Sequence, residues 1–147
     1  MIRQATYSDI KSLAKVGAEI VTTTMPFFKA DIARIEQLLK AYISAASAKV
    51  LVSVNVNGQV VGGALIVNQP NLWAEKHNSQ IIGLFTSVAG DGVRMLNAIV
   101  EWFHTRKNSL IICYAAPIKS RLDALLLKNK FELQGTMLVR RKYHGVP

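Results

Sequence analysis

The chain has 147 residues, half of them hydrophobic and 18% charged, a composition that predicts one folded domain and excludes a disordered chain. Lysine and arginine outnumber aspartate and glutamate by 18 to 9, and the net charge of +9 favours phosphorylated cofactors, nucleic acid or acidic proteins as partners without choosing among them. The longest apolar runs, residues 60–67 and 110–116, are too short to span a membrane. The N-terminal segment has no signal-peptide core, and the lone Cys113 excludes an internal disulfide, so we expect a cytoplasmic protein.

The N-terminal third predicts a short strand followed by two helices. Residues 2–6 alternate weakly between apolar and polar and indicate the strand. Ser8 offers an N-cap to a helix whose apolar residues keep helical spacing up to residue 20. In residues 21–28, "VTTTMPFF", the β-branched threonines and the proline disfavour its continuation. Asp31 then begins a second helix that ends near residue 43.

The middle of the chain predicts a hairpin and a further strand. Residues 49–56 and 59–67 are two strand-like runs separated by Asn57–Gly58, which is a strong hairpin turn. A loop rich in asparagine and proline occupies residues 68–78. It leads into an apolar run over residues 80–88 that indicates a buried strand.

The last part predicts a helix over residues 93–107, a buried strand over 109–115, a helix over 118–130 and two closing strands. The closing strands are residues 131–135 and 136–143. The order is β-α-α-β-β-β-α-β-α-β-β, and no repeat or linker divides it. We therefore expect an α/β (α+β) fold with a mixed central sheet and helices on both faces.

This order of elements and four segments resemble the GNAT superfamily of acetyl-CoA-dependent N-acetyltransferases. The segments are the opening "IRQATYSDI", the hairpin "VNGQVVGGALI", "GDGVRMLNAIVEWF" at the family's cofactor loop and third helix, and "LLLKNKFELQG" at its fourth helix. The resemblance covers nearly the whole chain and implies a single GNAT-like domain over residues 1–147. In its small size and basic charge the chain also resembles compact GNAT-like proteins encoded by bacteriophages. That resemblance would place the protein in a host bacterial cytoplasm.

The resemblance implies that residues 85–94 bind acetyl-CoA or another acyl-CoA. A helix N-terminus presents unpaired N–H groups and a partial positive charge, and glycines let a pyrophosphate approach the backbone without meeting a Cβ. By the same reasoning a branched side chain at Gly92 would block the ligand and disfavour a positive φ. The family's strand before the loop pairs its backbone with the pantetheine amides. The residues expected to bind the cofactor are Phe85, Thr86, Ser87, Val88, Gly90, Asp91, Gly92, Val93 and Arg94.

Three features of this loop leave a second interpretation open. The usual Arg or Gln before the glycines is absent, and only Ala89 separates Val88 from Gly90. Asp91 would repel a phosphate unless it turns away or caps the helix. A lone Gly-x-Gly is a tight turn at most sites, so the alternative is a turn between a strand and a helix.

The family's usual catalytic groups are missing. Its fourth-strand Glu has no counterpart in residues 80–88, and Leu126 stands where the family often has a Tyr that protonates the leaving sulfur. Tyr114 is the candidate substitute for that acid, and a buried structural tyrosine is the alternative. Cys113 is a candidate nucleophile or an inert apolar thiol. Glu75 or Glu19 is a candidate base acting through water, and we expect no metal ligands.

The sequence therefore favours transfer of an acyl group from acyl-CoA to an amine of a protein or small molecule. Catalysis would come mainly from holding the thioester and the amine together. The alternative is a protein that retains the fold, has lost the chemistry and binds a host or partner protein, with or without CoA. Nucleic-acid binding has only the net charge in its favour.

Overall fold

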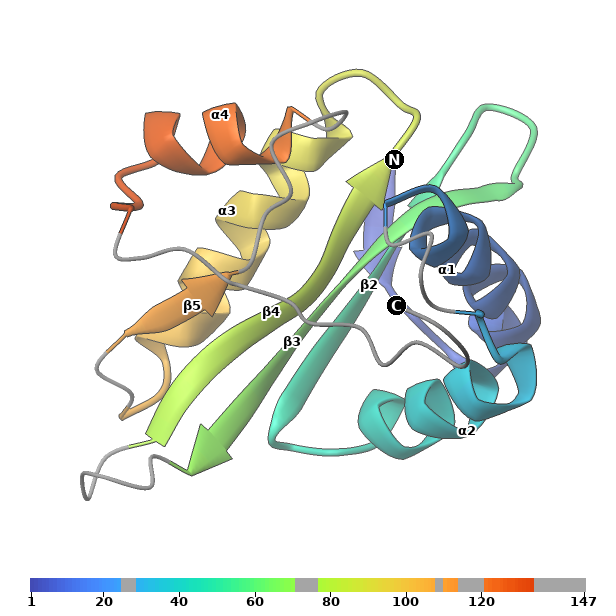
Figure 1. Cartoon of the computed structure of the whole chain (residues 1–147), viewed down its shortest axis with the longest axis horizontal. Helices are drawn as coiled ribbons and strands as arrows, with labels where there is room; N and C mark the ends of the chain where they lie inside the picture. The colour runs from blue at the N-terminus through green and yellow to red at the C-terminus, as the bar shows by residue number, and fades with distance from the viewer. Residues whose placement is uncertain (25–28, 71–76, 108–109, 114–120, 134–147) are drawn as a thin grey trace, which may run out of the picture.

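The computed structural model describes residues 1–24, 29–70, 77–107, 110–113 and 121–133, and these form a sheet with helices on both faces (Figure 1). The five strands lie in the order β1-β2-β3-β4-β5. The first three pairings are antiparallel, and β4 and β5 are parallel. The elements are β1 Ile2–Gln4, a 3₁₀ turn Tyr7–Asp9, α1 Ile10–Thr24, α2 Ile32–Ile43, β2 Ala48–Val54, β3 Val60–Pro70, β4 His77–Thr86, α3 Asp91–His104, β5 Ile111–Cys113 and α4 Leu122–Lys128. This order confirms the prediction from the first strand to the fourth helix.

The start of α1 differs from the prediction that Ser8 caps it. Ser8 lies inside the 3₁₀ turn, and the backbone N–H of Thr6 donates to Asp9 Oδ2 over 2.8 Å. Asp9 also accepts two bonds from the guanidinium of Arg3, at 2.7 and 2.9 Å, and the pair links β1 to the turn. The hydrogen bond from Arg3 is the largest cause that lowers the pKa of Asp9, which falls to about 2.

The prediction that the first helix stops before residues 21–28 is wrong for residues 21–24, because α1 runs to Thr24. The hydroxyl of Thr22 donates to the carbonyl of Ala18, one turn earlier, over 2.9 Å. That bond gives the threonine hydroxyl a partner inside a helix, so its β-branching does not end the helix. Residues 25–28 lie outside the described residues.

Two local signals, the helix cap at Asp31 and the hairpin turn at Asn57–Gly58, are confirmed. Asp31 caps α2, with its side chain accepting from the backbone N–H of Arg34 over 3.1 Å. Gly58 has a φ of 77°, as the tight hairpin between β2 and β3 requires. The expected loop over residues 68–78 is shorter, because residues 68–70 pair with residues 77–79.

The second half also differs from the prediction at its helix ends. The third helix is Asp91–His104 rather than 93–107, and the fourth is Leu122–Lys128 within the expected 118–130. Residues 131–133 do not lie in a strand, whereas 131–135 was expected to form one. The remainder of the two closing strands lies outside the described residues.

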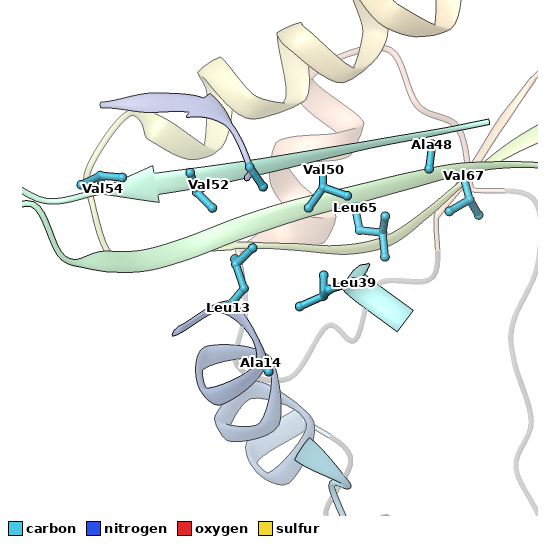
Figure 2. Close-up of a cluster of buried hydrophobic side chains, with 10 residues drawn as sticks. Leu13, Ala14, Leu39, Ala48, Val50, Val52, Val54, Leu65 and Val67 are labelled. Carbon is cyan, nitrogen blue, oxygen red and sulfur yellow. The ribbon is translucent and has the colours of Figure 1, made fainter. Parts of the chain in front are cut away.

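Two apolar clusters hold the layers together, one on each face of the sheet. On one face, α1 and α2 direct Leu13, Ala14 and Leu39 toward β2 and β3 (Figure 2). On the other, α3 buries Met95, Leu96 and Ile99, each with no exposed surface. Burial of a large apolar side chain contributes about 1.5–3 kcal/mol, so α3 is fixed firmly on the sheet. In the described residues, no helix is long and apolar enough to cross a membrane.

Candidate functional site

The described pairing between β4 and β5 lies in the first half of β4. Their pairing covers Ser79–Ile111, Gln80–Ile112 and Ile81–Cys113. Beyond it, β4 continues to Thr86 and then into the loop before α3 (Figure 1). The register with β3 shifts at the same place, which leaves Ile82 opposite no residue as a β-bulge. A bulge bends its strand. Among the described residues, the β5 side of β4 therefore has no strand partner after Ile81.

The first turn of α3, which follows the end of β4, presents two backbone N–H groups that have no acceptor among the described residues. Gly90 is the N-cap, with a φ of 83° that a residue with a side chain rarely adopts. The N–H of Asp91 donates to the carbonyl of Val88, and the N–H of Arg94 to that of Gly90, both over 3.2 Å. The N–H groups of Gly92 and Val93 between them have no acceptor inside the helix, and Gly90 has no side chain to cap them. Two free donors at a helix N-terminus favour an anion.

Asp91 turns away from this anion-binding end and into the protein. Its side chain has no exposed surface. Oδ2 accepts from the hydroxyl of Ser53 over 2.8 Å and from the amino nitrogen of Met1 over 3.1 Å. Oδ1 accepts from Nη1 of Arg94 over 2.9 Å. Burial acts to raise the pKa of Asp91, but these three hydrogen bonds outweigh it and lower the pKa. The negative charge expected to repel a phosphate is therefore directed inward and paired.

Gly92 does not have the positive φ that the sequence suggested. It lies within the first turn of α3, and the positive φ belongs to Gly90. A Cβ on Gly92 would lie 3.7 Å from Leu125 and 3.9 Å from Thr86, which are ordinary contacts with α4 and β4. The positive φ that disfavours a side chain therefore occurs at Gly90 and not at Gly92.

The other expected binding residues surround the same loop. Phe85 and Thr86 end β4, and Ser87 and Val88 connect it to Gly90. Phe85 is 41% exposed and Ile82, at the bulge, is 48% exposed. Arg94 lies at the start of α3, where its side chain is 64% exposed although its guanidinium is paired with Asp91.

The catalytic candidates receive less support from the geometry. Tyr114 and Glu75 lie outside the described residues. Burial raises the pKa of Cys113 to about 11, so its thiol stays protonated near neutral pH and is a poor nucleophile. In the part of the chain that the structure describes, no three histidines, cysteines or acidic residues gather as metal ligands would.

Sequence reasoning missed Ser53, which lies at a buried position of β2 and contacts Asp91. The signal was a serine within the apolar run "VLVSV", at a position with no exposed surface. A buried hydroxyl requires a hydrogen-bond partner. The partner itself was not predictable because it comes from a distant helix.

The comparisons with known proteins rest on structure alone. No family model matches this chain, and no curated protein matches it in sequence. A mutant protein from Bacillus halodurans is 17% identical with a TM-score of 0.76, over 97% of this chain and 99% of that one. A ribosomal-protein-alanine N-acetyltransferase from Brucella melitensis is 16% identical with a TM-score of 0.68, over 97% of this chain and 98% of that one. An aminoglycoside 6'-N-acetyltransferase from Acinetobacter baumannii is 12% identical with a TM-score of 0.68, over 99% of both chains.

These similarities define the architecture of the chain. The superposition covers nearly the whole of each protein. The chain therefore has a GNAT-like α/β fold. At 17% identity or less, the similarity establishes the fold alone.

Proposed function

We propose that the protein is an acyl-CoA-dependent N-acyltransferase, which transfers an acetyl or other acyl group to an amine. The observation that carries the proposal lies in the described residues: β4 has no strand partner on its β5 side after Ile81, and two N–H groups at the start of α3 have no acceptor inside the helix. Backbone groups along β4 after Ile81 would pair with the amides of pantetheine. The N–H groups of Gly92 and Val93 would bind the pyrophosphate. Both binding groups lie at one edge of the sheet, in a chain with the GNAT fold.

When bound, acyl-CoA supplies a thioester that an amine nitrogen can attack, forming a C–N bond as the C–S bond breaks. The residues of this chain hold the two reactants together, which by itself lowers the barrier substantially. The raised pKa of Cys113 argues against an acyl group carried on that thiol, so direct transfer to the amine is the simpler route. Tyr114 remains the proposed donor of the proton to the sulfur.

The fold does not decide which amine accepts the acyl group. The names of two structural neighbours specify acceptors as different as an alanine of a ribosomal protein and an aminoglycoside. We therefore propose an amine of a protein or a small molecule. The net charge of +9 favours an acceptor that carries negative charge nearby.

Two observations favour a second candidate, a domain that binds a partner protein without catalysis. The expected cation of the loop, Arg94, is already paired with Asp91, and β4 contains no carboxylate. A protein of this kind would retain the fold and bind its partner with or without bound CoA.

Titration calorimetry with acetyl-CoA and desulfo-CoA tests the proposal, followed by mass spectrometry of a lysate incubated with isotope-labelled acetyl-CoA. We expect binding of both ligands and acylation of a lysate component that depends on the protein. Binding without acylation would support the partner-binding candidate, and no binding of either ligand would refute the proposed function.

Arg94→Ala tests the phosphate site directly. If the guanidinium moves from Asp91 to the cofactor, we expect about tenfold weaker binding of acetyl-CoA, equivalent to about 1.4 kcal/mol. Arg34→Ala is the matched control, because Arg34 is also exposed and lies in the first turn of a helix. Equal affinities of the two variants would remove Arg94 from the site.

A further inference from the structure

Two hydroxyl groups meet across an intervening strand because that strand has a glycine between them. Ser53 of β2 pairs with Gly62 of β3, and Gly62 pairs in turn with Thr86 of β4. Strands separated by a third strand are about 10 Å apart, yet Oγ of Ser53 and Oγ1 of Thr86 are 2.6 Å apart. A Cβ on Gly62 would lie 2.7 Å from Cβ of Thr86 and 2.3 Å from the carbonyl oxygen of Phe85. The hydroxyls therefore meet in space that a side chain on β3 would fill.

These hydroxyls belong to a chain of hydrogen bonds with a fixed direction. The ionised carboxylate of Asp91 only accepts, so Ser53 donates to it. The single hydroxyl proton of Ser53 is then engaged with Asp91, so the hydroxyl of Thr86 must donate to Oγ of Ser53. Thr86 in turn accepts from the backbone N–H of Val88 over 3.1 Å. Because the N–H of Asp91 donates to the carbonyl of Val88, the chain closes into a ring around the loop before α3.

We propose that Ser53, Thr86 and Asp91 are positioning residues for the pyrophosphate site at the start of α3. Their ring holds the loop over residues 87–90 and the first helical turn. The N–H groups of Gly92 and Val93 then face the ligand, while the carboxylate of Asp91 does not. The inference rests on the proposed function, since it assigns these residues to cofactor binding. Each member is satisfied by the next, and such closed networks specify one local conformation.

Asp91→Asn gives a test in which two explanations predict opposite changes in the affinity for acetyl-CoA. If Asp91 acted only through its charge, its removal would strengthen the binding of the polyanionic acetyl-CoA. If it positions the loop, we expect binding at least tenfold weaker, because a neutral amide cannot accept from Ser53, Met1 and Arg94 together. Glu101→Gln removes the same charge from the exposed part of α3 and is the control. Tighter or unchanged binding of acetyl-CoA by Asp91→Asn, measured by calorimetry, would overturn the proposal.

Thr86→Val and Thr86→Ser form a matched pair that separates positioning from general stability. Valine keeps the shape without the hydroxyl, and serine keeps the hydroxyl. We expect Thr86→Val to weaken acetyl-CoA binding about tenfold and Thr86→Ser to restore most of the affinity. Pantetheine, which lacks the pyrophosphate, should bind both variants alike in an NMR titration. Equal losses for acetyl-CoA and pantetheine would mean a merely structural role and overturn the proposal.

Ser53→Ala is the milder third variant, because it removes one oxygen from a buried site and is expected to stay folded. It should reproduce the loss seen for Thr86→Val. A folded Ser53→Ala protein with the parent affinity would overturn the positioning role alone. A parent protein that binds no acetyl-CoA would instead refute the proposed function, and the positioning role with it.

Discussion

Replacing Gly62 with alanine is expected to destabilise the protein strongly. The new Cβ would lie 2.3 Å from the carbonyl oxygen of Phe85 and 2.5 Å from Cα of Thr86. Both are backbone atoms, so β3 and β4 must separate. Overpacking of this kind costs about 1–3 kcal/mol, and losing the bond between Ser53 and Thr86 adds about 1–2 kcal/mol. We expect the free energy of unfolding to fall by about 2–5 kcal/mol, a large part of a typical total.

Urea unfolding followed by circular dichroism measures this change, and thermal unfolding should show a fall of about 10 °C. Gly83→Ala is the matched control, since Gly83 is exposed in β4 and a Cβ there meets no described atom within 4 Å. It should change the free energy of unfolding by less than about 1 kcal/mol. If Gly62→Ala proves as stable as Gly83→Ala, the close approach of β3 and β4 at Gly62 is not a constraint and the reasoning fails.

Three further predictions concern the described residues. Arg3 holds the pKa of Asp9 at about 2, so the contribution of Asp9, about 1–2 kcal/mol, is present above pH 4 and is lost as the pH falls toward 2. In Asp9→Asn, the free energy of unfolding measured with urea should vary less with pH over that range. The same pH dependence as in the parent protein would contradict this. The raised pKa of Cys113, about 11, predicts alkylation by iodoacetamide at pH 7 at least about 100-fold slower than for free cysteine; a comparable rate would contradict it. Gly92→Ala should raise the free energy of unfolding by up to about 1 kcal/mol, because alanine favours the helix and its Cβ would make only ordinary contacts. A lower free energy of unfolding than in the parent protein, measured with urea, would contradict this.

The parts of the fold that depend on neighbouring residues were predictable from the sequence. Asn57–Gly58 requires a tight turn wherever the flanking strands go, and Asp31 can cap a helix with its own side chain. The departures arise where a local preference is outweighed. Thr22 disfavours a helix by its branching, but its hydroxyl binds the carbonyl of Ala18 and α1 continues.

The candidate site likewise has a part that was predictable from the sequence and a part that was not. The sequence by itself placed a glycine loop between a strand and a helix, and it posed the problem of a negative charge at Asp91. Only the tertiary structure decided that Asp91 points inward, because its partner Ser53 is 38 residues away in the chain. Ser53 and Thr86, 33 residues apart, meet only because the register of three strands brings Gly62 between them. Register depends on contacts between distant segments, and a pattern of neighbouring residues does not contain that information.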